Sequence, residues 1–233
     1  MIRNNEYVEK ILATSEVARI GFADLSEIEE ETRYGFPYGV CIAVALTVFP
    51  GIAGPKKEYY DEYRRVSGVL RETSNNLAEK IKERGYRAYS LAMERQDDRF
   101  RTQLPYKTLA TRAGLGWIGK SATLVTKEYG NAIRLNGVLT DMPFVTGTPI
   151  NESLCGGCEE CVKRCPGNAI SGRLWRLGID RDELLNPAEC KKTVIRRGER
   201  WDVTEGSCGV CISVCPYTRQ YKNKMQSEAV SCP

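Results

Sequence analysis

Apolar residues in the first half of the chain follow two different spacings. From 56 to 84 they recur at steps of three, four and seven with charges between them, which predicts one long amphipathic helix ending at Gly85. The run GVCIAVALTVF at 39–49 predicts a strand that is buried on both faces. Weaker patterns predict further helices and strands. The helices are expected at 4–13 and 105–114, and the strands at 17–25 and 86–93.

Turn-forming residues divide the rest of the chain. Residues 94–104 are polar and predict a loop, whereas 143–150 are rich in Pro, Gly and Thr and predict a linker. Between them, SATLVT (121–126) and AIRLNGVLT (132–140) predict two strands, with KEYGN as a hairpin turn. The pattern therefore predicts an α/β (α+β) fold.

The composition is that of a globular chain with one or two domains. The 233 residues are 42% hydrophobic, which is enough to bury a core. No apolar stretch approaches the about 20 residues of a membrane span, and the start MIRNNEYVEK carries no export signal, so we expect a cytoplasmic protein with no membrane partner. The net charge of +4 is too weak to indicate a nucleic-acid partner. We expect an α/β cofactor or substrate domain over 1–150 and a cysteine-rich domain with a polar tail over 151–233.

Cysteine is the residue that indicates chemistry, in a chain that has no histidine. Eight of the ten cysteines lie between 155 and 215. CGGCEECVKRCP at 155–166 has the spacing of two-cluster ferredoxins, in which three cysteines bind one [4Fe–4S] cube and the fourth binds the other. CGVCISVCP at 208–216 is one ligand short, and Cys190 supplies the missing thiol. The sequence thus predicts a ferredoxin-like double-cluster domain.

The reciprocal arrangement divides the eight cysteines into two ligand sets. The first cluster takes Cys155, Cys158, Cys161 and Cys215, and the second takes Cys165, Cys190, Cys208 and Cys211. Zinc is the alternative, but zinc sites more often combine C-x2-C pairs with long gaps and histidine. Of the other two cysteines, Cys41 is expected as a buried apolar side chain and Cys232 as an inert or free thiol in the tail.

Basic residues accumulate near the cysteines. Eight thiolates and two oxidised cores carry a charge of about −4, which offsets the formal +4 of the chain. The cations either stabilise these anions and dock an electron donor, or form an ordinary solvated face. They are Lys163, Arg164, Lys191, Lys192, Arg196 and Arg197.

Three features together resemble a known family: RAGLGWIGKSATLVTKEYG (112–130), LTD (139–141) and the cysteine module with its separate Cys190. They are similar to epoxyqueuosine reductase and, more distantly, to the corrinoid reductive dehalogenases. The resemblance implies a nitroreductase-like α/β domain that holds cobalamin base-off, two [4Fe–4S] clusters that feed its cobalt, and reductive cleavage of a substrate. The tRNA enzyme continues into a tRNA-binding extension, whereas this chain ends soon after the second motif. We therefore expect a short form with a small electrophilic substrate rather than tRNA.

The resemblance also assigns residues. Gly114, Gly116 and Gly119 would let the backbone approach a corrin, Lys120 and Ser121 would donate hydrogen bonds to it, and Trp117 would pack against the cofactor or the cluster module. The alternative is a glycine-rich turn with Trp117 in the core. Tyr106 is the candidate proton donor, because the dehalogenases use a tyrosine and no histidine is present. Its alternative is an aromatic side chain packed at a helix start.

Three functions follow from these features. The first is an iron–sulfur, cobalamin-dependent reductase that receives electrons from reduced ferredoxin or flavodoxin. The second is an electron-transfer protein or corrinoid-reducing partner without a substrate of its own. The third is a flavin-binding reductase, since the nitroreductase architecture binds flavin in other proteins.

Overall fold

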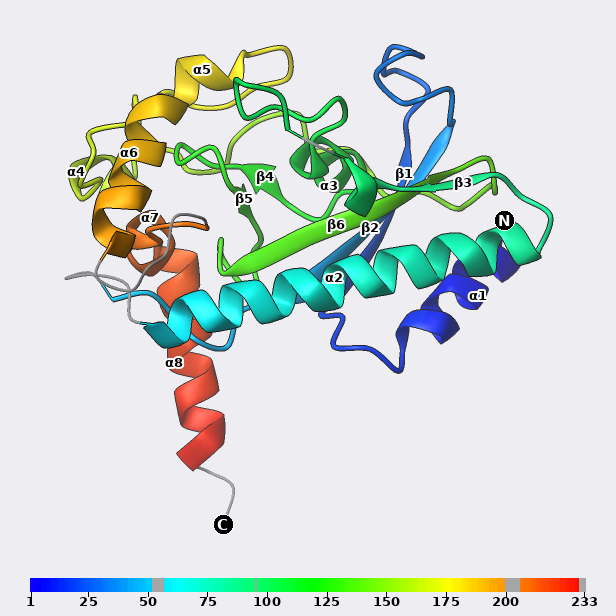
Figure 1. Ribbon diagram of the computed structural model, residues 1–233, viewed down its shortest axis with the longest axis horizontal. Coiled ribbons are helices and arrows are strands. Elements are labelled where there is room, and N and C mark those ends of the chain that lie inside the picture. The colour runs from blue at the N-terminus through cyan, green and yellow to red at the C-terminus, as the bar shows by residue number, and fades with distance from the viewer. Residues whose placement is uncertain (52–56, 95, 200–205, 231–233) are drawn as a thin grey trace. The chain divides into compact units, whose positions relative to one another are not determined.

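The computed structural model describes residues 1–51, 57–94, 96–199 and 206–230 (Figure 1). It has a mixed α/β fold, as the sequence predicts. The helices are α1 (Ile2–Leu12), α2 (Lys57–Glu83), α3 (Tyr106–Arg112), α4 (Glu160–Lys163), α5 (Arg181–Leu184), α6 (Pro187–Gly198), α7 (Val210–Ser213) and α8 (Pro216–Val230), with a 3-10 turn at Leu91–Met93. The strands are β1 (Arg19–Asp24), β2 (Tyr38–Ala45), β3 (Ala88–Ser90), β4 (Trp117–Ile118), β5 (Leu124–Val125) and β6 (Ile133–Thr140).

The chain forms two compact units, and each is assembled from separate segments. The first unit contains Met1–Ala45, Arg65–Gly116 and Arg134–Ile150. The second contains Leu46–Arg64, Trp117–Ile133 and Asn151–Pro233. The second unit thus combines the cysteine-rich segment with two segments from the first 150 residues. Whether 1–150 and 151–233 behave as two domains stays a prediction.

A four-stranded sheet with the order β1-β2-β6-β3 organises the first unit. β2 is buried along its interior, as its apolar run predicts, and pairs antiparallel with β1. Helix α3 packs on β1 and β2, and a Cβ at Gly39 would lie 2.5 Å from Leu109. Cys41 is fully buried in β2, where burial raises the pKa of its thiol to about 12, so the prediction of an apolar core cysteine is confirmed.

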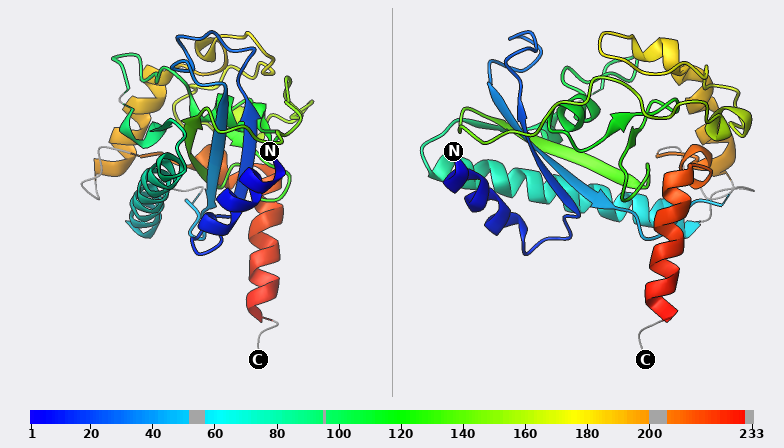
Figure 2. Two further views of the ribbon diagram at one scale, coloured as in Figure 1. Left: turned by 90° about the vertical axis from the view of Figure 1, so that its right-hand side faces the viewer. Right: turned by 180° about the vertical axis from the view of Figure 1, so that it is seen from behind.

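Helix α2 has the apolar stripe that its spacing predicts, with Val66, Leu70 and Ile81 buried. Helix α1 lies beside the C-terminal end of α2 (Figures 1 and 2). The Tyr7 hydroxyl donates to the carbonyl of Lys80 at 3.0 Å, and Arg84 lies 4.1 Å from the centre of the Tyr7 ring. No helix among the described residues has the length and hydrophobicity to cross a membrane.

Residues 143–150 are not the loose linker that their composition predicts. The segment lacks regular structure, but the Gly147 N–H donates to Phe22 and the Ile150 N–H donates to Thr111, both at 2.9–3.0 Å. Gly147 contacts the backbone so closely that a Cβ would lie 2.2 Å from the carbonyl oxygen of Ala113. These residues therefore pack tightly onto the first unit.

The predicted hairpin of 121–126 with 132–140 is wrong in its pairing. β5 pairs antiparallel with β4, whereas β6 belongs to the four-stranded sheet. The turn at KEYGN closes only with an isolated bridge between Thr126 and Gly130. The chain then diverges because Gly130 and Asn131 are held against Thr218 at the start of α8, so a contact distant in sequence overrides the local turn signal.

Candidate iron–sulfur site

The two cysteine motifs of the second unit fold in the same way, as a tight turn followed by one turn of helix. In the first motif, the Cys158 N–H donates to the Cys155 carbonyl at 3.1 Å, and α4 carries Cys161. In the second, Gly209 adopts a φ of +72°, which favours glycine, and α7 carries Cys211. The short spacings can be closed only by such turns, and these bring the thiols of each motif to one side.

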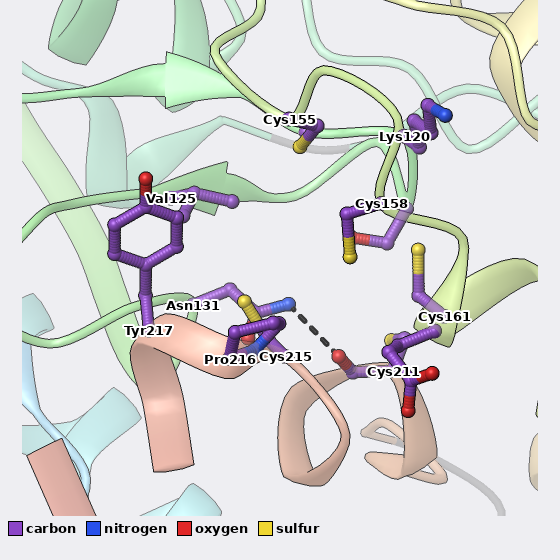
Figure 3. Close-up of a pocket in the computed structure, with 13 residues that line it drawn as sticks. Lys120, Val125, Asn131, Cys155, Cys158, Cys161, Cys211, Cys215, Pro216 and Tyr217 are labelled. Carbon is purple, nitrogen blue, oxygen red and sulfur yellow. Dashed lines mark hydrogen bonds between the residues drawn. The ribbon is translucent and has the colours of Figure 1, made fainter. Parts of the chain in front are cut away.

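Five thiols line a cavity of about 50 Å³: the four predicted for the first cluster, and Cys211, which is predicted for the second. In Figure 3 the sulfur atoms of Cys155, Cys158, Cys161 and Cys215 lie on different sides of this space. Burial, together with the nearby sulfurs of Cys155, Cys158 and Cys215, raises the pKa of the Cys161 thiol to about 11. These four cysteines are the ligand set predicted for the first cluster.

The other four thiols form a second group. Burial raises the pKa of Cys190 to about 11, with contributions from Cys208 and Cys165. Burial also raises the pKa of Cys211 strongly, and Cys208, Cys190, Cys161 and Cys165 all contribute to that rise. Cys190 therefore lies where the sequence required a fourth ligand, and the neighbouring Cys161 and Cys211 connect the two groups.

Hydrogen-bond donors point at several of these sulfurs. The indole N–H of Trp117 donates to Cys155 Sγ at 3.4 Å, and the Ala169 N–H donates to Cys165 Sγ at 3.3 Å. Cys215 accepts hydrogen bonds from Tyr217 and Thr218, which oppose the rise that burial causes in its pKa. Donors of this kind stabilise thiolates and the negative charge of an iron–sulfur cluster.

The arrangement does not suit a single zinc ion. Thiolates bind zinc at about 2.3 Å, so the sulfurs of a zinc site converge on one point. Within the described ranges, no three Cys, Asp or Glu side chains are grouped to hold one ion, and every described cysteine is a free thiol. Thiols spread around a cavity suit a four-iron cube instead. Cys232 lies outside the described residues.

A buried polar network joins the cysteine motifs to residues 117–133 of the same unit. The Asn131 side chain donates to Thr123 Oγ1 at 3.0 Å and to the Cys211 carbonyl at 3.2 Å. It also accepts a hydrogen bond from the Thr218 hydroxyl at 2.8 Å, and its own backbone N–H donates back to that hydroxyl. Neither role was predicted, because Asn131 was only the last residue of the predicted KEYGN turn and Thr218 stands in no recognisable motif.

Comparison with known proteins is consistent with this geometry. Residues 154–218 match the family described as "4Fe-4S double cluster binding domain". The epoxyqueuosine reductase of Listeria monocytogenes is 34% identical over 119 residues, which cover 48% of this chain and 29% of that protein. That of Lactococcus garvieae is 27% identical over 268 residues, covering 96% of this chain and 72% of that protein. The tetrachloroethene reductive dehalogenase of Sulfurospirillum multivorans is 32% identical over 114 residues, which cover 47% of this chain and 23% of that protein.

The chain is thus similar to epoxyqueuosine reductases, and its residues 154–218 match a double [4Fe–4S] cluster domain. Its fold agrees with that of solved structures. Epoxyqueuosine reductase with an epoxyqueuosine-modified tRNA stem loop matches with a TM-score of 0.62 at 21% identity, covering 93% of this chain and 66% of that one. A catabolic reductive dehalogenase matches with a TM-score of 0.70 at 19% identity, and the match covers 97% of this chain and 34% of that one. The chain spans less than half the length of the Listeria monocytogenes and Aliivibrio fischeri relatives.

Most of the residues expected to contact a corrin lie around the first cysteine cavity. Gly119, Lys120 and Ser121 line it, and a Cβ at Gly119 would lie 3.4 Å from Cys155 Sγ. Trp117 is buried and packs edge-on against Tyr217, with ring centres 5.1 Å apart. A cavity of about 50 Å³ with cysteine walls fits an iron–sulfur cube and not a corrin.

The two remaining glycines lie in the first unit, where the chain's own backbone accounts for Gly114. Gly114 has a φ of +72°, and a Cβ there would lie 2.6 Å from the Thr148 carbonyl oxygen. Gly116 is buried. The assignment of these glycines to a corrinoid therefore stays a prediction.

Tyr106 lies in a cluster of tyrosines and one carboxylate. Its hydroxyl donates to the Leu91 carbonyl at 3.0 Å, and burial, Glu94 and Tyr89 raise its pKa. Tyr34 donates to Glu94 Oε1 at 2.5 Å and has a φ of +54°, which is strained for a tyrosine. The sequence did not indicate Tyr34, Tyr89 or Glu94, because only the fold brings these residues to Tyr106.

Three of the basic residues near the cysteines are paired on the surface. Lys163 pairs with Glu159 at 3.3 Å, and Arg164 pairs with Glu160 at 3.5 Å, in each case one helical turn apart. Lys192 pairs with Glu189 at 2.7 Å. These exposed pairs belong to an ordinary solvated face and contribute little to stability.

Proposed function

We propose that this chain is an iron–sulfur oxidoreductase in which two [4Fe–4S] clusters carry single electrons to a bound cobalamin. The observation that carries the iron–sulfur part is the division of eight thiols into two groups, with Cys190 completing the second. The proximity of Cys161 and Cys211 supports electron transfer between the clusters, because each of these residues belongs to a different ligand set.

The residues of the chain have separate tasks in this proposal. The eight cysteines bind iron, and the N–H groups of Trp117 and Ala169 stabilise the thiolate charge. Residues 1–150 supply the cofactor and substrate domain, and 151–233 supply the cluster domain. A reducing cytoplasm would keep the thiols available, and reduced ferredoxin or flavodoxin would be the electron donor.

The cobalamin part rests on relatives and not on a cavity in the described chain. One solved neighbour is a reductive dehalogenase whose structure suggests a mechanism for B12-dependent dehalogenation. Since the chain has no histidine, a bound cobalamin would have no imidazole ligand from the protein, and it would supply a nucleophilic cobalt for a small electrophilic substrate. A modified tRNA, as in the solved epoxyqueuosine reductase complex, is the other substrate class to test.

Anaerobic reconstitution tests both parts of the proposal. The protein is loaded with iron and sulfide in the presence of cobalamin, and its iron content and absorption spectrum are recorded. We expect about eight irons per chain and a base-off corrinoid spectrum. Cys190→Ser should lower the iron content towards half, whereas Cys41→Ala, which removes a core thiol, should retain it. A content far below eight in the wild type would contradict the ligand sets.

The other two functions predict different spectra. Clusters without a corrinoid would favour an electron-transfer protein or corrinoid-reducing partner, and a flavin spectrum would favour a flavin-binding reductase. The iron–sulfur assignment would remain in both cases, because it depends on the thiols alone.

Tyr106 is proposed as the proton donor because the resemblance assigns a tyrosine to that role and its hydroxyl carries a proton at neutral pH; its raised pKa makes it a weaker acid than a free tyrosine. Tyr106→Phe should abolish turnover and leave the iron content and corrinoid spectrum unchanged. Unaltered turnover would exclude Tyr106 from the reaction and leave its hydrogen bond to Leu91 as its role.

A further inference from the structure

Arg197 is half-buried, and its guanidinium group is incompletely hydrogen-bonded. Its Nε and Nη2 atoms are both inaccessible to solvent, and neither has a hydrogen-bond partner in the part of the chain that the structure describes. A buried cation whose donors are unused is strongly destabilising unless an anion compensates it. Arg197 therefore differs from the surface cations Lys163 and Lys192, which have carboxylate partners.

Arg197 lies in the last turn of α6, the helix that carries Cys190. The two residues are seven positions apart, which places them on one helix face about two turns from each other. Between them, Thr193 and Val194 are buried. Burial raises the pKa of the Cys208 thiol, while the Val210 N–H and the nearby Arg197 guanidinium oppose that rise. The cation thus lies close to two predicted ligands of the second cluster.

A second unused donor lies at the same place. The Tyr60 hydroxyl is buried without a partner among the described residues. Burial and Cys208 raise its pKa, and Arg197 lowers it, so all three groups are neighbours. A Cβ at Gly206, two residues before Cys208, would lie 3.7 Å from the Tyr60 ring. Two donors from α2 and α6 therefore converge beside one cysteine of the second group.

We propose that Arg197 and Tyr60 are positioning residues that tune the second cluster. Their N–H and O–H groups donate to Cys208 Sγ or to the inorganic sulfides of the cube. Reduction adds one electron, and hence one negative charge, so a buried cation stabilises the reduced cluster more than the oxidised cluster and raises its reduction potential. The first cavity has its own buried cation, Lys120, so the inference concerns the shift at the second cluster and not the order of the two potentials. This inference rests on the ligand sets of the proposed function.

A redox titration of the holoprotein tests the inference, with the reduced clusters followed by EPR. Arg197→Gln should lower one of the two midpoint potentials, the one that is lost in Cys190→Ser, and leave the other unchanged. Arg197→Lys, which keeps the charge but loses the guanidinium fork, should lower it less. Tyr60→Phe should also lower that midpoint alone, by a smaller shift. Lys192→Gln is the matched control, because it removes one exposed charge from the same helix.

A shift in Arg197→Gln no larger than that in Lys192→Gln would overturn the proposal. Should Arg197→Gln fail to bind the second cluster, Arg197→Lys is the variant that tests the proposal. If Arg197→Lys has the iron content of the wild type and a lower midpoint potential for the second cluster, tuning by the cation is supported. Loss of iron in both variants would show a structural role and also overturn the proposal. A wild-type protein with one midpoint or about four irons would instead contradict the ligand sets.

Discussion

At the scale of single residues, burial is the dominant influence on the cysteine thiols. It raises the pKa of Cys161 and of Cys190 to about 11 and that of Cys211 well above its ordinary value, so without iron these thiols are protonated at neutral pH. Iron must displace these protons, which makes the free energy of cluster binding depend on pH. The structure therefore combines ligands that are reluctant to ionise with donors such as Trp117 that stabilise the charge once a cluster is bound.

Cluster retention should weaken as pH falls. Because the pKa values of these thiols are raised to about 11, protons compete with iron for the sulfurs at all pH values below about 11. We expect an iron chelator to bleach the holoprotein faster at pH 6 than at pH 8, measured as the rate of loss of cluster absorbance. The same chelator with a plant-type ferredoxin corrects for the pH dependence of the reagent. A corrected rate that is equal or slower at pH 6 would contradict this expectation.

At the scale of elements, the start of α8 depends on the turn at 126–130. Gly130 has a φ of +58°, and a Cβ there would lie 2.2 Å from the Thr218 backbone nitrogen. Thr218 and Tyr217 donate hydrogen bonds to Cys215, the ligand that the second motif contributes to the first group. This turn therefore positions a cluster ligand more than eighty residues away.

Gly130→Ala should disturb the first cluster. The added methyl group would clash with the backbone of Thr218 and displace the donors to Cys215, so we expect the iron content to fall towards about four per chain. Gly157→Ala is the control, since a Cβ at Gly157, inside the first cysteine motif, meets nothing within 4 Å. The measurement is iron per chain after reconstitution. Equal iron contents in the two variants would show that the turn is not needed for the site.

At the scale of the whole molecule, the clusters alter the net charge. The chain alone carries a formal charge of +4 and has a pI of about 8.5. Two oxidised clusters with eight thiolates add about four negative charges, which brings the loaded protein close to neutrality at pH 7.

Isoelectric focusing under nitrogen should therefore separate the loaded and iron-free forms. We expect the loaded protein to focus well below pH 8.5, near neutrality, and the iron-free protein to focus close to the sequence value. Loading of Cys190→Ser should produce a smaller displacement, because it lacks one ligand of the second cluster. Equal positions of the loaded and iron-free wild type would contradict the predicted number of thiolate ligands.

Local patterns were sufficient for most of the elements. The spacing in α2, the apolar run of β2 and the proline and glycine that bracket α3 are each set by neighbouring residues, and all three predictions are confirmed. The hairpin and the linker were wrong because Gly130 packs on Thr218 and Gly147 packs on Ala113, contacts between residues far apart in the chain.

From the sequence alone, the short C-x2-C and Cys-Pro spacings with the separate Cys190 predict two sets of four cysteine ligands, and the hydrophobic spacing predicts the fold class. Only the tertiary structure decided what surrounds those sulfurs. The hydrogen bond from the Trp117 indole to Cys155 and the network at Asn131 join distant segments, and no spacing shows that two guanidinium nitrogens of Arg197 are inaccessible to solvent. The predicted ligands follow from spacing along the chain, whereas the electrostatic environment of a cluster is a sum over all the groups that folding brings near it.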